Sequence, residues 1–187
     1  MSSPEQVVLA TPSAARRGVA LVLGTALVAV AAQVSVPLPG TPVPASLQPL
    51  AVLLVGGLLG PGLGASSLIL YLGLGAAGLP VFTPYGAPGI ARLLGPTGGY
   101  LLAYPVAAWA VGKLAGEGRS YLRLLGAALA GLALIHLGGA AQLLVLTGSA
   151  RGALRLGTTP FIASDLGKVA IAALVLRHSV RPLRARL

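Results

Sequence analysis

The organisation of this chain is most readily inferred from one segment near its end, Thr159-Pro-Phe-Ile-Ala-Ser-Asp165-Leu-Gly-Lys168-Val-Ala-Ile-Ala-Ala-Leu-Val-Leu176. This segment has the composition of a membrane helix into which two opposite charges are set. Asp165 and Lys168 are three residues apart, so they share one helix face and can touch. Charged side chains are costly in hydrocarbon and usually face a bundle interior or a polar cavity. The pair is therefore the first candidate for a functional site, with a purely structural ion pair as the alternative.

The composition of the whole chain indicates an integral membrane protein. Of its 187 residues, 56% are hydrophobic and 9% are charged, whereas a soluble domain carries roughly 25% charged residues. We therefore expect an all-α fold, a compact bundle that crosses the cell membrane several times. No separate soluble domain is left over for a catalytic or nucleotide-binding role.

Apolar segments separated by Pro- and Gly-rich turns predict six transmembrane helices. The expected helices are 17–35, 50–60, 65–77, 100–114, 122–147 and 159–177. Proline-rich 37–44, glycine-rich 78–99 and the segment 147–158 are expected to be loops, because four prolines in eight residues and repeated Gly-Pro pairs disfavour helix. The chain then divides into a mobile lead (1–14), the membrane domain (15–178) and a basic tail (179–187).

The distribution of basic residues predicts that both termini are cytoplasmic. Six spans place the two ends on the same side, and most Lys and Arg residues fall there. They are Arg16, Arg17, Lys113, Arg119, Arg123, Arg177, Arg181, Arg184 and Arg186. A cleaved signal peptide is the alternative for the first helix, but its apolar run is long enough to span the membrane, which favours retention.

Several function classes are disfavoured by composition. The net charge of +10 is interpreted as membrane topology, because aromatic residues for base stacking make up only 4% of the chain. Cysteine is absent, and His136 and His178 are too far apart in sequence for a convincing metal site. No Walker-type phosphate loop is present, so the chain is not expected to hydrolyse ATP itself. We expect no metal ion and no cofactor.

The predicted topology places the charged pair beneath the outer loops. Asp165 would lie about 10 Å from the outer end of the last helix, at 1.5 Å per residue. Phe82, Tyr85 and Tyr100 offer flat apolar surfaces nearby, and Arg92 adds a cation. Such a pocket suits a small ligand with N–H donors, an apolar body and an anionic end. It suits a metal ion or an open channel poorly.

Four motifs together resemble those of the BioY family, the biotin-specific S components of energy-coupling factor (ECF) transporters. They follow one another in the family's order over about residues 15–178. The motifs are Val36-Pro-Leu-Pro-Gly-Thr-Pro-Val-Pro44 with Gln48, Gly78-Leu-Pro-Val-Phe82, Gly95-Pro-Thr-Gly-Gly-Tyr100, and Pro160-Phe161 followed by Asp165 and Lys168. The resemblance implies biotin capture on the outer face. It also implies assembly with a transmembrane coupling subunit and two cytoplasmic ATPase subunits, which would hydrolyse ATP.

Asp165, Lys168, Tyr100 and Phe82 match motif positions of the family, and their chemical roles are a hypothesis built on these matches. Asp165 would accept hydrogen bonds from the ureido N–H groups of biotin, and Lys168 would orient Asp165 or donate to the ureido oxygen. Phe82 and Tyr100 would pack against the rings, and Arg92 or a loop amide would meet the carboxylate. Gln48 matches a position in the first loop of the family.

The docking surface is expected on the first helix. The family's Ala-xxx-Ala pattern has its nearest equivalent at Ala20 and Gly24, although the same small residues could serve ordinary packing inside the bundle.

Three other functions remain open at this point. The same scaffold could bind a different vitamin-like ligand, or the chain could be a structural membrane subunit. An intramembrane hydrolase would use Ser66 or Ser67 with His136, but the glycine expected after such a serine is absent.

Overall fold

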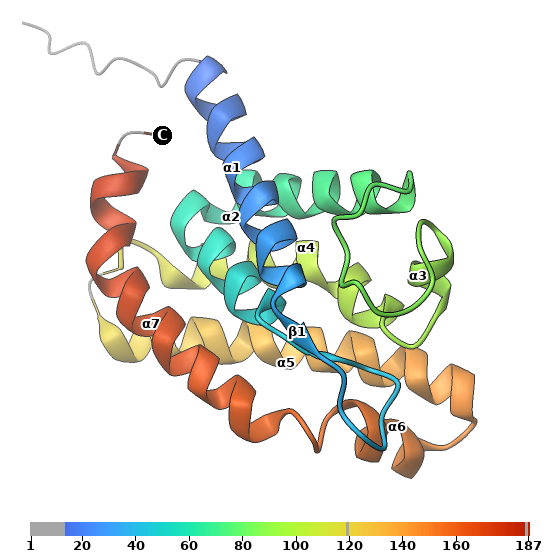
Figure 1. Ribbon diagram of the computed structural model, residues 1–187. Coiled ribbons are helices and arrows are strands. Elements are labelled where there is room, and N and C mark those ends of the chain that lie inside the picture. The colour runs from blue at the N-terminus through green and yellow to red at the C-terminus, as the bar shows by residue number, and fades with distance from the viewer. Residues whose placement is uncertain (1–13, 119, 186) are drawn as a thin grey trace, which may run out of the picture.

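The computed structural model describes residues 14–118, 120–185 and 187, and these form helices joined by turns and one short hairpin (Figure 1). The predicted all-α class is confirmed. Most of the predicted lead (1–13), Arg119 and Arg186 lie outside the described residues. The elements are α1 (Ala14–Gln33), β1 (Ser35–Val36), β2 (Ala45–Ser46), α2 (Gln48–Ala76), α3 (Ala91–Leu94), α4 (Gly98–Ala115), α5 (Tyr121–Thr147), α6 (Ala150–Gly157) and α7 (Ile162–Arg184).

Helix α2 is two helices joined at a sharp bend. Gly60 has φ 83° and ψ 177°, which interrupts the helical backbone, and Pro61 follows it. A positive φ is readily adopted by glycine, and proline has no N–H for the preceding turn. Figure 1 shows the chain turning sharply between the two halves of α2. The predicted break between the second and third helices is therefore present, and it is tighter than expected.

Arg184 joins this bend to the ends of two other helices. Because Pro61 has no N–H, the carbonyl of Gly57 lacks its usual partner four residues later. Arg184 fills that position: its Nη2 donates to the Gly57 carbonyl at 2.6 Å and its Nε donates at 3.1 Å. The same guanidinium donates to the carbonyls of Gly112 (3.1 Å) and Gly116 (2.7 Å) at the end of α4. Arg184 thus closes the bundle at the end of α7.

We expect Arg184→Gln to lower the thermal unfolding temperature of the purified chain by several degrees. The substitution leaves part-buried carbonyls without partners, and each such loss costs about 1–3 kcal/mol. Arg181→Gln is the matched control, because Arg181 is an exposed arginine on the same helix. Equal unfolding temperatures for the two variants would show that Arg184 does not hold the helix ends together.

All three predicted loops contain secondary structure. The glycine-rich segment 78–99 contains the short helix α3 and the first two residues of α4. The proline-rich loop is closed by β1 and β2, which pair antiparallel with Ser35 opposite Ser46. The prediction of a loop at 147–158 is wrong, because this segment contains the helix α6. The Ser149 side chain caps the first turn of α6 by accepting a hydrogen bond from the Gly152 N–H. The hairpin reaches this helix, where the Thr41 hydroxyl donates to the Leu156 carbonyl at 2.6 Å.

The last helix also differs from its predicted bounds. It begins at Ile162, bent by 57° from α6, and it continues to Arg184. Asp165 is therefore only three residues, or about 4.5 Å, from the start of the helix. The predicted depth of about 10 Å counted residues that belong to the turn between α6 and α7. An acidic residue in the first turn is favoured by the helix dipole.

The interior is divided into two apolar clusters, and the outer faces are apolar as well. One cluster lies under the hairpin and includes Val28, Tyr71 and Ile135, and the other lies toward the end of α7 and includes Leu124 and Leu176. Many exposed side chains on α1, α4, α5 and α7 are large and hydrophobic. A soluble protein would bury such faces, so these helices belong in a membrane.

By length and hydropathy, three of the described helices can cross a membrane: α1, α2 and α5. The bent pair α6–α7 passes the same test when it is taken as one span. The count of six spans stays a prediction. The first described turn of α1 and the end of α7 lie at the same end of the molecule (Figure 1), where Arg17 Nε donates to the Leu187 carbonyl at 3.5 Å.

Candidate ligand-binding site

A cavity lies between the hairpin, the 78–92 loop and helices α4, α5 and α7. Its walls are mostly apolar with a few polar groups, as is usual for sites that bind small molecules. It is lined by Val43, Pro44, Ser46, Gln48, Pro49, Phe82, Thr83, Arg92, Thr97, Tyr100, Leu101, Tyr104, Ile135, His136, Phe161, Asp165 and Lys168. Six of the seven residues predicted to bind substrate are therefore brought together: Gln48, Phe82, Arg92, Tyr100, Asp165 and Lys168.

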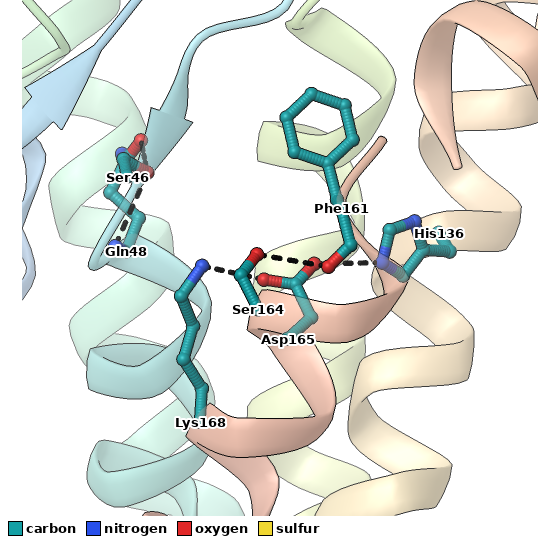
Figure 2. A network of polar contacts seen from close by, with 7 residues as sticks. All are labelled: Ser46, Gln48, His136, Phe161, Ser164, Asp165 and Lys168. Atoms are coloured by element: carbon teal, nitrogen blue, oxygen red, sulfur yellow. Dashed lines mark hydrogen bonds and ion pairs between the residues drawn. The ribbon is translucent and has the colours of Figure 1, made fainter. Parts of the chain in front are cut away.

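A chain of three polar side chains lies at one side of the cavity (Figure 2). Lys168 Nζ is 2.5 Å from Asp165 Oδ1, and His136 Nε2 is 2.9 Å from Asp165 Oδ2. Asp165 is 3% exposed and Lys168 is 9% exposed, so neither charge faces lipid. Their mutual neutralisation reduces the cost of burial, and the cavity gives each a route to a ligand.

His136 lines the cavity although its position in the sequence does not predict this, and the same is true of Thr83 and Thr97. His136 lies in the middle of α5, 29 residues before Asp165, so no local spacing connects the two. The only signal available was a single histidine in an otherwise apolar helix. Within the described chain no group of three or more His, Cys, Asp or Glu side chains could hold a metal ion.

Tyr100 forms one wall of the cavity and is fixed from two sides. Its hydroxyl donates to the Gly157 carbonyl at 2.6 Å, which ties α4 to α6. Its ring meets the His136 ring edge to face, with centroids 6.1 Å apart and planes at 81°. The ring also packs directly on Gly139, where no side chain intervenes. Tyr100 is therefore a rigid apolar surface beside the polar chain.

The opposite wall is organised around Tyr71. Gln48 Nε2 donates to the Tyr71 hydroxyl at 2.6 Å, and that hydroxyl donates to the Val81 carbonyl at 3.0 Å. Phe82 packs edge to face on Tyr71 with a centroid distance of 5.4 Å. These contacts fix the glycine-rich loop against the start of α2. Gln48 and Phe82 are both buried, at 4% and 6% exposure.

Arg92 was predicted to meet the ligand carboxylate, but the donors of its guanidinium group are directed at the protein's own loop. Its Nε donates to the Ala87 carbonyl at 2.8 Å, and its terminal nitrogens donate to the carbonyls of Thr83 and Tyr85 and to the Thr83 hydroxyl. Burial lowers the pKa of this guanidinium from its ordinary value, and a nearby tyrosine, Tyr71, partly offsets this. Arg92 thus holds the loop together, while one edge of it still lines the cavity.

Tyr85 is not brought to the cavity with the others. Its side chain is 42% exposed on the outside of the loop, and it lines a separate hollow beside Gly86 and Pro96. The sequence places an aromatic residue in the right loop but does not show which way it points.

The two residues predicted for partner docking lie on the inner face of α1. Ala20 is 8% exposed, and a side chain on Gly24 would lie 2.8 Å from Leu59 Cδ1 and from Ser67 Oγ. Both residues therefore face α2 within this chain, as expected if they serve ordinary packing inside the bundle. The exposed face of α1 carries larger residues such as Val22 and Leu23.

Among the residues that the structure describes, Ser66 and Ser67 do not form a hydrolase site with His136. The Ser67 hydroxyl is buried between α2 and α1 and lies 2.9 Å from the Leu63 carbonyl and 3.1 Å from the Leu21 carbonyl. Neither Ser66 nor Ser67 lines the cavity that contains His136. The partner of His136 is a carboxylate whose other oxygen is held by Lys168. Ser164 lies next to this carboxylate in the chain, but its hydroxyl donates to the Phe161 carbonyl at 2.9 Å.

A helical bundle with apolar outer faces and a partly polar internal cavity is the architecture of a membrane protein that binds a small ligand. Comparison with known proteins makes the class specific. The model of the BioY family matches residues 5–185. The chain belongs to the BioY family, a family of transport proteins, and it is not an enzyme.

Individual relatives agree with this assignment. The probable biotin transporter BioY of Pyrococcus horikoshii is 44% identical over 155 residues, which is 82% of this chain and 89% of the relative. The biotin transporter BioY of Thermotoga maritima is 39% identical over 153 residues, covering 81% and 88%. The crystal structure of the S-component for biotin from an ECF-type ABC transporter superposes with a TM-score of 0.79, at 27% identity, covering 87% of this chain and 89% of that one.

Proposed function

We propose that this chain captures biotin as the substrate-binding S component of an ECF transporter in the cytoplasmic membrane. The observation that carries the proposal is the buried Asp165–Lys168 pair, which opens onto a largely apolar cavity in a chain of the BioY family. Biotin combines a ureido group, an apolar ring system and a carboxylate at the end of a flexible chain. The cavity offers groups that match each of these parts.

The proposed pose places the ureido group at the polar chain. Asp165 accepts from the ureido N–H groups, and Lys168 orients this carboxylate or donates to the ureido oxygen. The apolar rings lie between Phe82 and Tyr100. The carboxylate points toward the hydroxyls of Thr83 and Thr97, which line the cavity beside Arg92. This modifies the predicted role of Arg92, because its donors are already directed at loop carbonyls.

The proposed topology has six spans and two cytoplasmic ends. The break at Gly60 supports counting α2 as two spans, and α4 adds another to α1, α5 and α7. The basic residues at the ends of α1 and α7 support a cytoplasmic location for both termini. The cavity would then open to the outside, beneath the hairpin and the glycine-rich loop.

This topology can be tested with single cysteines, because the chain has none of its own. We expect Tyr85→Cys to react with a membrane-impermeant maleimide in intact cells. His178→Cys, near the end of α7, is expected to react only after the cells are permeabilised. The reverse pattern would place the cavity on the cytoplasmic side.

The partners proposed are a transmembrane coupling subunit and two cytoplasmic ATPase subunits. The proposal is supported by the similarity to the crystal structure of the S-component for biotin from an ECF-type ABC transporter. The buried positions of Ala20 and Gly24 do not support a docking surface built from these residues. Because these two residues are buried, we propose that the coupling subunit contacts the exposed face of α1 instead.

Equilibrium binding of radiolabelled biotin to the purified chain tests the proposed function. We expect saturable binding with one biotin per chain, displaced by unlabelled biotin. Riboflavin and thiamine at the same excess are expected to leave the bound radioactivity unchanged. Absence of saturable binding, or stronger displacement by another vitamin, would contradict biotin as the ligand.

A further inference from the structure

The carboxylate of Asp165 is held at both oxygens by residues of two different helices. Lys168 Nζ on α7 donates to Oδ1 at 2.5 Å, and His136 Nε2 on α5 lies 2.9 Å from Oδ2 (Figure 2). A carboxylate oxygen has two acceptor positions, so each oxygen still has one for a ligand N–H. The orientation of the carboxylate plane decides where these free positions point. Two donors from separate helices fix that plane, whereas one donor would leave it free to turn.

The surroundings of His136 indicate which ring nitrogen carries the proton. Its Nδ1 is buried, and it has no hydrogen-bond partner among the residues that the structure describes. A second proton on the ring would leave a charged N–H buried without an acceptor, which is unfavourable. Asp165 is ionised by its pairing with Lys168 and can only accept, so the His136 nitrogen facing it must donate. The neutral imidazole with its proton on Nε2 satisfies both conditions.

His136 itself is held in place. The Tyr100 ring meets it edge to face, and the Tyr100 hydroxyl is anchored on the Gly157 carbonyl. The contacts therefore run from α6 through Tyr100 and His136 to Asp165 on α7. This arrangement suits a positioning residue, which acts on the ligand through another side chain.

We infer that His136, as the neutral Nε2–H tautomer, is a positioning residue that sets the orientation of the Asp165 carboxylate for the N–H donors of the ligand. This inference rests on the proposed function and adds a residue to its site. Without His136, the ammonium of Lys168 could donate to both oxygens of Asp165. The carboxylate would then turn toward Lys168, and its free acceptor positions would no longer match the ureido group.

Two variants of His136 separate donation from simple packing. His136→Gln keeps a donor at nearly the position of Nε2, and we expect its biotin affinity to stay within about fivefold of the wild type. His136→Leu keeps the bulk but has no donor, and we expect its affinity to fall by about 10-fold or more, as for loss of a hydrogen bond to a charged group. His178→Leu is the control, because His178 is the other histidine of the chain and is exposed. We expect it to bind like the wild type.

A second binding readout distinguishes orientation from general damage. In an Asp165→Asn background, His136→Leu is expected to cause no further loss of affinity, because the carboxylate it orients is gone. The inference would be overturned if His136→Leu lowered affinity as much in the Asp165→Asn background as in the wild type. It would also be overturned if His136→Leu alone bound biotin with wild-type affinity. Equal loss in the Gln and Leu variants would also overturn it. Absence of biotin binding by the wild type would contradict the proposed function, whereas the outcomes above contradict only the role of His136.

The tautomer gives a test that does not depend on measuring biotin affinity. Nitrogen-15 NMR of histidine-labelled chain reports which ring nitrogens are protonated, and His136→Gln assigns the two signals. We expect His136 to show a protonated Nε2 and an unprotonated Nδ1 at neutral pH. Protonation at Nδ1, with or without Nε2, would contradict the inferred state.

Discussion

Asp165→Asn is expected to raise the dissociation constant for biotin by about 100-fold. The asparagine amide keeps one acceptor oxygen but presents an NH2 group in place of the other, and hydrogen bonds to a charged group are worth about 1.5–3 kcal/mol each. Losing one such bond, together with the charge that strengthens the other, corresponds to a factor of about 100 in affinity. Isothermal titration of the purified variant with biotin measures the change.

The control for this variant concerns Lys168, which would be left as a buried charge without a counter-ion. Such a charge destabilises the fold by about 3–5 kcal/mol in other proteins. The double variant Asp165→Asn with Lys168→Met removes the charge, so we expect its unfolding temperature to recover while biotin binding stays weak. Recovery of binding in the double variant would show that Asp165→Asn binds weakly because Lys168 is left as an unpaired buried charge, and not because a contact with biotin is lost.

The second large effect is expected from Gly139→Val on α5. The Tyr100 ring lies directly on Gly139, so any side chain there overlaps the ring. Tyr100 cannot move back without losing its hydrogen bond to Gly157, and a shift toward the cavity narrows the binding site. Overpacking of this kind costs about 1–3 kcal/mol, which corresponds to an affinity loss of about 5- to 150-fold if Tyr100 takes up the strain.

Gly126→Val is the matched control, because Gly126 lies on the same helix with no atom near the position of its missing side chain. We expect this variant to bind biotin like the wild type and to unfold at nearly the same temperature. Competition with radiolabelled biotin measures both variants. If Gly139→Val binds as tightly as Gly126→Val, Tyr100 is not a fixed wall of the site.

The sequence predicts those parts of the site that depend on local pattern. Asp165 and Lys168 are recognisable because two opposite charges three residues apart are rare in an apolar helix. Gln48, Phe82 and Tyr100 are identified through family motifs, and all three line the cavity. The break at Gly60 follows from glycine next to proline, which interrupts a helix wherever it occurs.

Other features depend on contacts that no local pattern encodes. His136 reaches Asp165 only because α5 and α7 lie side by side. The direction of Tyr85 is set by the turns of its loop, which hold Arg92 inside and leave the tyrosine outside. The helix α6 was missed because its eight residues are too short and polar to resemble a membrane span. The small residues of α1 fit either an inner or an outer face, and only packing against α2 decides between them.

We propose that the Asp165–Lys168 pair recognises the ureido group of biotin from inside the cavity. An experimentally determined structure of the purified chain with biotin bound would test this directly. We expect the ureido nitrogens within hydrogen-bond distance of Asp165 and the ring system between Phe82 and Tyr100, with the carboxylate toward Thr83 and Thr97. Biotin bound with its carboxylate on Lys168, or outside this cavity, would contradict this proposal.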